Sequence, residues 1–215
     1  MVKLSRYATS GMLEDQYEPC TRKRILKNIP GIRKKRELEA HETDELFRTT
    51  AQLIQTYDKD HRFTASDICS MHKQWLGSIY TWAGTYRQVM ISKAEFPFAA
   101  PVYIPNLMDE YEHTILRSYT PCIFNTSEEI VHALAVVHTE LLLIHPFREG
   151  NGRISRLLAT LMALQAGLPL LDFTSIRGRT RKEYFQAVRI GMRRDYAPMR
   201  KLFFSVVSRT LKSSR

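Results

Sequence analysis

Two strongly apolar segments that follow each other closely constrain the fold more than any other feature of this chain. The first begins at the cap-type residue Ser127 and carries apolar residues at helical spacing up to Ile144. The second runs from about Gly152 to Ala166 and is closed by Gly167. Because helices this apolar are buried, the sequence predicts two core helices joined by a short connection.

The rest of the chain is also mainly helical in pattern. Apolar spacing and cap-type residues predict further helices at 36–57, from Thr64 through Ile79, from Asn106 through Ile115, at 181–192 and at 199–211. The segment 87–105 differs, because it alternates loosely and contains three prolines, which favours a short strand or hairpin. With no repeat or linker, the prediction is an all-α single domain over residues 1–215 with one small β excursion.

Several classes of protein are excluded by composition. No apolar run approaches the roughly 20 residues needed to span a bilayer, so we expect no membrane association. The N-terminus lacks the apolar stretch of a secretory signal peptide. The three cysteines, Cys20, Cys69 and Cys122, have no ligand-like spacing, which argues against a disulfide framework and a zinc site and fits a reducing compartment.

The positive charge is concentrated at the C-terminal end. Residues 177–215 contain twelve Lys and Arg against two acids, so this segment alone accounts for the net charge of +10. A basic face of this kind attracts polyanions such as ATP or nucleic acid. No nucleic-acid recognition motif accompanies it, and we interpret it as a solvated basic face rather than a dedicated nucleic-acid site.

The connection between the two apolar helices concentrates residues suited to phosphate chemistry. Gly150 and Gly152 permit backbone conformations in which N–H groups converge on an anion, and the helix N-terminus adds partial positive charge. Arg153 and Arg156 are placed to form a cationic clamp, Glu149 is a candidate Mg²⁺ ligand, and His145 can exchange a proton near neutral pH. This set suits phosphoryl or nucleotidyl transfer.

Each of these residues alone also has a purely structural interpretation. Helix connections commonly contain Gly, Asn and Pro, a lone histidine is usually structural, and two arginines on a helix are often only surface charge. Their concentration in twelve consecutive residues, 145–156, favours the functional interpretation. No Walker motif occurs in the chain.

The segment His145-Pro146-Phe147-Arg148-Glu149-Gly150-Asn151-Gly152-Arg153-Ile154-Ser155-Arg156 resembles the active-site motif of the Fic family, HPFx[D/E]GNGRxxR, at every defined position. Residues 80–87 and 91–93 resemble the family's "WAG…R" segment and flap, and residues 17–32 resemble the N-terminus of its filamentation-protein branch. The resemblance covers most of 17–205. It implies the all-α Fic fold, a helical bundle with a small β-hairpin flap over the active site.

The resemblance also implies roles within the motif. His145 would be the general base that deprotonates the acceptor hydroxyl of a target protein, and Glu149 would hold Mg²⁺ against the phosphates of ATP. Gly150, Asn151 and Gly152 would form the anion hole. Arg153 and Arg156 would bind the phosphate tail. Phe147 would be core, and Arg148 receives no role.

The flap, roughly Val89 to Phe98, would pair with the target peptide by strand addition, with Ile91, Ser92 and Lys93 as its target-binding residues. A plain exposed hairpin tip is nearly as good an interpretation of Ser92 and Lys93. The kinase-like Doc branch has a lysine at the position of Gly152, so the glycine implies transfer of AMP. The alternative is a phosphotransferase or other group transferase on the same scaffold. A third hypothesis is a non-catalytic binding module that uses the basic C-terminal face.

Regulation and location are also inferred from the resemblance. Many members are inhibited by a helix with the motif [S/T]xxxE[G/N], whose glutamate pairs with the second arginine of the active site. Ser10 to Glu14 matches five positions, but Asp15 breaks the sixth. We therefore expect inhibition by a separate small antitoxin-like protein, or none, rather than by Glu14. The location implied is the bacterial cytoplasm, or a host cell that receives the chain as an effector.

Overall fold

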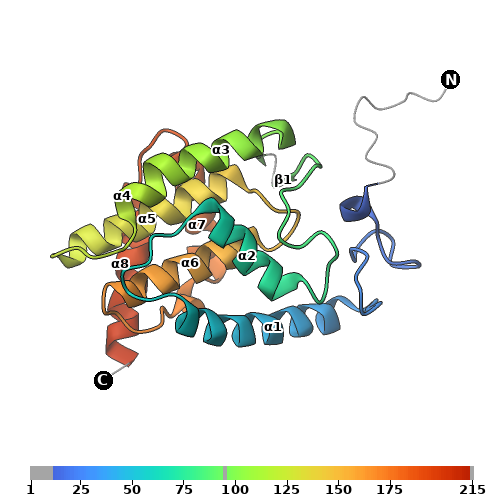
Figure 1. Cartoon of the computed structure of the whole chain (residues 1–215), viewed down its shortest axis with the longest axis horizontal. Coiled ribbons are helices and arrows are strands. Elements are labelled where there is room, and N and C mark those ends of the chain that lie inside the picture. The colour runs from blue at the N-terminus through green and yellow to red at the C-terminus, as the bar shows by residue number, and fades with distance from the viewer. Residues whose placement is uncertain (1–11, 94–95, 214–215) are drawn as a thin grey trace.

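The computed structural model describes residues 12–93 and 96–213 and is mainly helical (Figure 1). Its α-helices are α1 (Lys35–Thr56), α2 (Ala65–Leu76), α3 (Ile104–Glu110), α4 (Arg117–Tyr119), α5 (Ser127–Ile144), α6 (Asn151–Gln165), α7 (Gly178–Gly191) and α8 (Ala197–Ser213). A π-helical segment, Tyr111–Leu116, joins α3 to α4, and three-residue 3₁₀ turns lie at Leu13–Asp15, Pro101–Tyr103 and Phe173–Ser175. The described strands are β1 (Ser92–Lys93) and β2 (Phe96–Pro97), which pair antiparallel.

Helix α5 is the centre of the bundle. It packs against α6, α7 and α8, while α2 packs against α1 and α6. Twelve residues of α5 and ten residues of α6 are buried. The two helices predicted from the apolar segments 127–144 and 152–166 therefore lie in the hydrophobic core, as their apolar composition requires.

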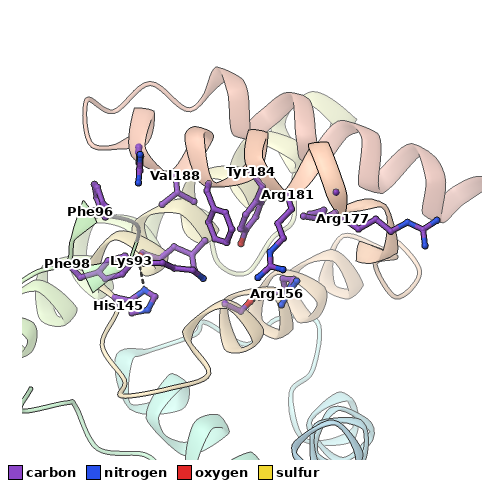
Figure 2. A pocket seen from close by; sticks show the side chains of 15 residues that line it. Lys93, Phe96, Phe98, His145, Arg156, Arg177, Arg181, Tyr184 and Val188 are labelled. Carbon is purple, nitrogen blue, oxygen red and sulfur yellow. Dashed lines mark hydrogen bonds between the residues drawn. The ribbon is translucent and has the colours of Figure 1, made fainter. Parts of the chain in front are cut away.

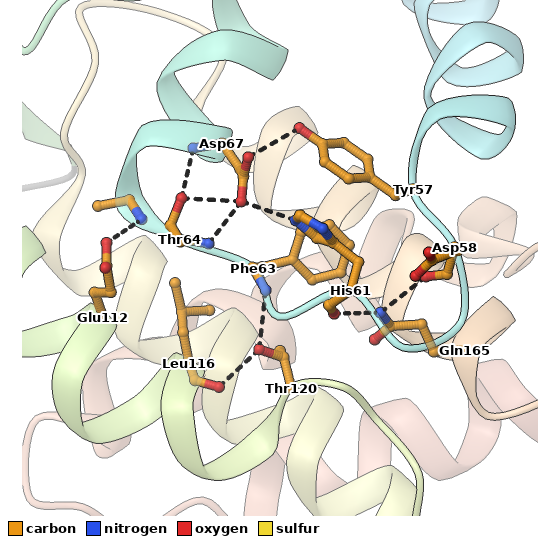
Figure 3. Close-up of polar contacts among 11 residues, drawn as sticks. Tyr57, Asp58, His61, Phe63, Thr64, Asp67, Glu112, Leu116, Thr120 and Gln165 are labelled. Atoms are coloured by element: carbon orange, nitrogen blue, oxygen red, sulfur yellow. Dashed lines mark hydrogen bonds and ion pairs between the residues drawn. The ribbon is translucent and has the colours of Figure 1, made fainter.

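Reciprocal caps explain where α2 and α5 begin. The hydroxyl of Thr64 accepts a hydrogen bond from the Asp67 N–H at 3.1 Å, and the Asp67 carboxylate accepts one from the Thr64 N–H at 2.9 Å. Thr126 and Glu129 form the same box at α5. The Asp67 carboxylate also binds His61 at 3.0 Å, which ties the start of α2 to the preceding loop (Figure 3).

Most predicted helices are confirmed, with shifts at their ends. The helix expected from Asn106 begins at Ile104, because Pro105 occupies the first turn, where its missing N–H costs nothing. Ile79 lies beyond the end of α2, yet it is fully buried in the next turn. The expected β excursion over 87–105 contains only two residues in each strand. Among the described residues, no helix is both long and apolar enough to cross a membrane.

Candidate active site

The active-site loop, residues 145–151, connects α5 to α6 and has two left-handed residues. His145 caps α5 with φ 54°, and Gly150 caps α6 with φ +83°. A Cβ atom on Gly150 would lie 2.7 Å from the Trp75 ring, so both the conformation and the packing require glycine there. Gly152 differs from expectation. It lies inside α6 with an ordinary φ, and a Cβ atom on it would meet nothing closer than Arg156 at 4.0 Å.

The loop is held in shape from inside by Asn151. Its side-chain oxygen accepts a hydrogen bond from the Phe147 N–H at 2.9 Å, and its amide donates to the Phe147 carbonyl at 2.7 Å. The Phe147 ring is fully buried, as predicted, and stacks on His72 with centroids 3.9 Å apart. Asn151 and Gly152 are the first two residues of α6, where backbone N–H groups have no acceptor within the helix. These N–H groups are available to an anion.

The His145 ring is placed by α5 and by the flap. Its Nδ1 lies 3.2 Å from the Leu142 carbonyl, which requires a proton on Nδ1 and leaves Nε2 as an acceptor in the neutral form. Its ring stacks on Phe98 with centroids 3.7 Å apart. Burial lowers the pKa of His145 to about 4; the bond to Leu142 opposes the shift, and the charges of Arg87 and Lys93 add to it. His145 is therefore neutral at pH 7 and able to accept a proton.

A cavity of about 480 Å³ lies between α6, α7 and the flap (Figure 2). No acidic side chain occurs among the described residues that line it. The lining includes His145, four aromatic residues and five cations. These cations are Lys93, Arg156, Arg177, Arg181 and Arg189. A cavity with this charge and these rings suits a ligand that combines a polyphosphate with an aromatic base.

The two arginines of the motif point to different places. The Arg156 side chain enters the cavity, as does the Arg181 side chain from α7 (Figure 2). The Nε of Arg156 donates to the Gly152 carbonyl at 3.0 Å. Arg153 instead forms an ion pair of 2.7 Å with Glu42 of α1, which is buried, and lies over the Trp75 ring at 4.6 Å. The expected two-arginine clamp is therefore not formed in this structure.

Glu149 belongs to the active-site loop, and its side chain is half exposed. Its carboxylate accepts a hydrogen bond from the Gly150 N–H at 2.9 Å and lies 3.7 Å from Arg153. Among the described residues, no group of three or more His, Cys, Asp or Glu could hold a metal ion. A single carboxylate fits a Mg²⁺ that arrives on nucleotide phosphates and keeps several waters, because Mg²⁺ is commonly bound in this way.

The flap closes one end of the cavity. Lys93 of β1 lines it and lies with its Nζ 4.3 Å from the centre of the Phe185 ring of α7. Burial lowers the pKa of Lys93, and the charges of Arg181 and Arg156 add to this. Ser92 is exposed and Ile91 is half buried, and neither lines the cavity.

Glu14 does not reach Arg156. Its carboxylate accepts a hydrogen bond from the Gln88 N–H, and its backbone carbonyl accepts one from Arg148 at 2.9 Å. Burial raises the pKa of Glu14. Ser10 and Gly11 of the matching motif lie outside the described residues. Arg148, to which the sequence assigned no role, thus binds the N-terminal segment and also donates to Tyr17 at 3.2 Å.

The residues of α7 that line one side of the cavity were not predicted from the sequence. Arg181, Phe185 and Arg189 line the cavity, and their spacing of four residues places them on one face of α7. This spacing was visible, but nothing in the sequence showed that this face turns toward the loop. Glu42 was missed for the same reason, because it lies more than one hundred residues from Arg153.

The sequence profile of the Fic/DOC family matches residues 62–163. The chain is 30% identical over 145 residues to the "Probable protein adenylyltransferase Fic" of Salmonella typhimurium, covering 66% of this chain and 68% of that protein. It is 28% identical over 190 residues to the Escherichia coli protein of the same name, covering 86% and 88%. The Bartonella tribocorum BepC structure with bound AMPPNP has a TM-score of 0.67 at 22% identity and covers 84% of this chain and 91% of that one.

The animal relatives are longer. The chain spans about a quarter to a third of the length of the Caenorhabditis and Nematostella proteins that it matches. The similarity to the Salmonella protein extends over most of both chains, and the family profile includes the whole active-site loop. The chain therefore belongs to the Fic/DOC family.

Proposed function

We propose that this chain transfers AMP from ATP to a hydroxyl group of a target protein. The observation that carries the proposal is the neutral His145 ring at the edge of a cavity lined by cations and aromatic rings. The relatives named above are called protein adenylyltransferases, and the BepC structure contains an ATP analogue.

The acceptor hydroxyl loses its proton to Nε2 of His145 as its oxygen attacks the α-phosphorus of ATP. A P–O bond forms to the acceptor, the bond between the α-phosphorus and the bridging oxygen breaks, and pyrophosphate leaves. Because Nδ1 is directed at the Leu142 carbonyl, the imidazole presents the correct nitrogen without rearrangement. The low pKa of His145 keeps it in the basic form before the substrate binds.

The phosphates are bound by backbone N–H groups of Asn151 and Gly152 and by cationic side chains. Arg156 and Arg181 come from different helices and point into the same cavity (Figure 2). Glu149 would ligate the Mg²⁺ that accompanies ATP, which neutralises charge on the phosphates. Gly152 leaves room for the α-phosphate next to α6, since a side chain there would project into open space.

The binding of the phosphate tail by Arg153 stays a prediction. In the structure its guanidinium pairs with Glu42 at 2.7 Å and lies over the Trp75 ring, so it would have to leave these partners to reach the phosphates. The flap residues Ile91, Ser92 and Lys93 would meet the target peptide, with Lys93 facing the nucleotide side.

We expect inhibition by a separate antitoxin-like protein, or none, rather than by Glu14, because the Glu14 carboxylate binds the Gln88 N–H. If Glu14 were an inhibitor, Glu14→Gln would raise the transfer rate; we expect no rise. The reaction needs ATP and an acceptor protein, which the bacterial cytoplasm and a host cell both provide.

ATP labelled at either the α or the γ position tests the proposal in lysate. We expect label on a protein only from the α position, and its loss in His145→Ala. His113→Ala is the matched control, because His113 is exposed and does not line the cavity. Label from the γ position would instead support a phosphotransferase. Equal labelling by the natural protein and His145→Ala would rule out the mechanism.

A further inference from the structure

Arg87 is a buried arginine outside the active-site loop. Its exposed fraction is 0%, although an arginine is among the residues least often buried completely. No carboxylate forms a direct ion pair with it in the described part of the chain. A buried charge without such a partner has to be stabilised by other polar groups, and their identity indicates what the residue does.

Four hydrogen bonds connect Arg87 to the active-site loop, which contains the proposed base, and to the flap, which would meet the target peptide. Its Nε donates to the carbonyl of His145 at 2.8 Å, and its backbone N–H donates to the carbonyl of Pro146 at 2.9 Å. Its two terminal nitrogens donate to Val89 at 2.7 Å and Ala99 at 2.6 Å. Val89 is the first residue of the flap and Ala99 directly follows its last residue, Phe98, so the two carbonyls mark the flap ends on either side of β1 and β2.

The flap also touches the base directly. Phe98, the neighbour of Ala99, stacks on the His145 ring and donates its N–H to the Ile91 carbonyl at 3.1 Å. The position of the His145 ring therefore depends on where the flap ends are held. Arg87 binds both flap ends and the backbone of His145 through one rigid, planar group.

Glu14 supplies a negative charge that acts on Arg87. Its carboxylate binds the N–H of Gln88, the residue after Arg87, and its charge opposes the lowering of the Arg87 pKa by burial. Arg148 holds the Glu14 carbonyl in turn. The N-terminal segment is thus attached at the point where the buried cation lies.

We propose that Arg87 is a positioning residue that fixes the flap and the His145 base relative to each other, with Glu14 as its counter-charge. This inference rests on the proposed transfer reaction. Lysine cannot replace Arg87, because a single ammonium group does not reach three carbonyls in separate directions.

Arg87→Lys and Arg87→Met test the proposal by hydrogen exchange, nucleotide binding and transfer rate. We expect amide exchange in 88–100 to accelerate by about tenfold or more in both variants, with α5 and α6 still protected. The Kd for ATP should change by less than about threefold, because Arg156 and Arg181 are untouched. The transfer rate should fall by about 100-fold, the usual cost of a misplaced catalytic group.

The pH dependence separates charge from geometry. The cations facing the His145 ring are Arg87, from the segment before the flap, and Lys93, from the flap itself. Both lower its pKa, so Arg87→Met should move the acidic limb of kcat/KM to higher pH. Arg87→Lys keeps the charge and should leave this limb in place while still losing rate. A residue needed only for folding would not give this difference.

Arg48→Met is the control, because Arg48 is an exposed cation of α1 that pairs with Glu45 and is not among the residues that bind Glu14 or the flap. Its flap exchange should stay at the natural level. Natural exchange and transfer in both Arg87 variants would overturn the proposal. Loss of protection spread equally over α5 and α6 would also overturn it, since Arg87 would then act only in folding. If the natural protein transfers no AMP, the proposed function fails, yet the exchange experiment still decides the role of Arg87.

Discussion

At the scale of single residues, His145, the proposed general base, has an unusual pKa. Burial keeps this pKa at about 4 in the free protein, well below the 6.5 of an exposed imidazole. The neutral form that accepts a proton therefore persists down to pH values near 4. A plot of kcat/KM against pH reports ionisations of the free enzyme and so records this difference.

We expect kcat/KM to change by less than about twofold between pH 7.5 and 5.5. A base with pKa 6.5 would lose about tenfold over the same interval, because only about one molecule in eleven stays neutral at pH 5.5. The Kd for ATP is measured at each pH as the control, since the γ-phosphate also titrates in this range. A tenfold loss in kcat/KM at constant Kd would contradict the buried, neutral base.

The Glu42–Arg153 pair is an interaction in which the position of one side chain depends on the other. Glu42 accepts hydrogen bonds from Tyr80 at 2.6 Å and from Arg153 at 2.7 Å, and its side chain is almost fully buried. Glu42→Gln leaves the Arg153 charge without its main partner. We expect a loss of about 3 kcal/mol in the free energy of unfolding, typical of a broken buried pair.

Urea unfolding measures this loss, and Glu42→Gln/Arg153→Gln completes a double-mutant cycle. If the two residues interact as described, the double variant is more stable than the sum of the single losses predicts. Additive losses would show that Arg153 takes its orientation from Trp75 rather than from Glu42.

At the scale of elements, the start of α6 contains two glycines with different requirements. Gly150 has φ +83° and faces the Trp75 ring, whereas Gly152 is helical with open space beside it. Gly150→Ala should therefore cost several kcal/mol of stability through backbone strain and overlap with Trp75. Gly152→Ala should leave the melting temperature nearly unchanged and raise the Kd for ATP, because its methyl group projects where the phosphate would lie.

Thermal melting and ATP titration of the two variants check this contrast. Equal destabilisation by both alanines would show that the space beside Gly152 is not open. An unchanged Kd in Gly152→Ala would show that the phosphate lies elsewhere.

The elements themselves were largely predictable from sequence, because local signals determine them. The cap at Thr64 and the apolar period of α5 and α6 depend only on residues close together in the chain, although the residue that caps α5 is Thr126 and not Ser127 as expected. Contacts between distant residues were not predictable. The turn of Arg153 toward Glu42 and the attachment of Arg148 to Glu14 result from packing of α1 and the N-terminal segment, which no local pattern reports.

At the scale of the whole molecule, loss of solvent keeps three histidines of the described residues in the neutral form: His72 and His138 are fully buried, and His145 is partly buried at the edge of the cavity. Burial lowers the pKa of His72 and His145 to about 4 and that of His138 to about 3. The His138 ring is completely buried, which lowers its pKa, and the bond that its Nδ1 donates to the Ser155 carbonyl at 3.1 Å opposes the shift. Its Nε2 accepts a hydrogen bond from the Tyr184 hydroxyl at 2.6 Å. The neutral ring joins α5, α6 and α7 with both nitrogens used, and a protonated ring would lose the bond from Tyr184.

This arrangement predicts that acid destabilises the fold well above the pH at which carboxylates protonate. The unfolded chain binds a proton on each histidine near pH 6.5, whereas the fold resists protonation down to about pH 4, so stability is complete above 6.5 and falls below it. At pH 5 each buried histidine contributes a loss of up to about 2 kcal/mol, from the 1.36 kcal/mol that one pKa unit represents. Three such losses are comparable with the whole stability of a domain.

Urea midpoints at pH 7, 6 and 5 measure this fall in the free energy of unfolding. His138→Gln should be less stable at pH 7 but lose less on acidification, so the two curves converge as the pH drops. Parallel curves would show that His138 is not a source of the acid sensitivity.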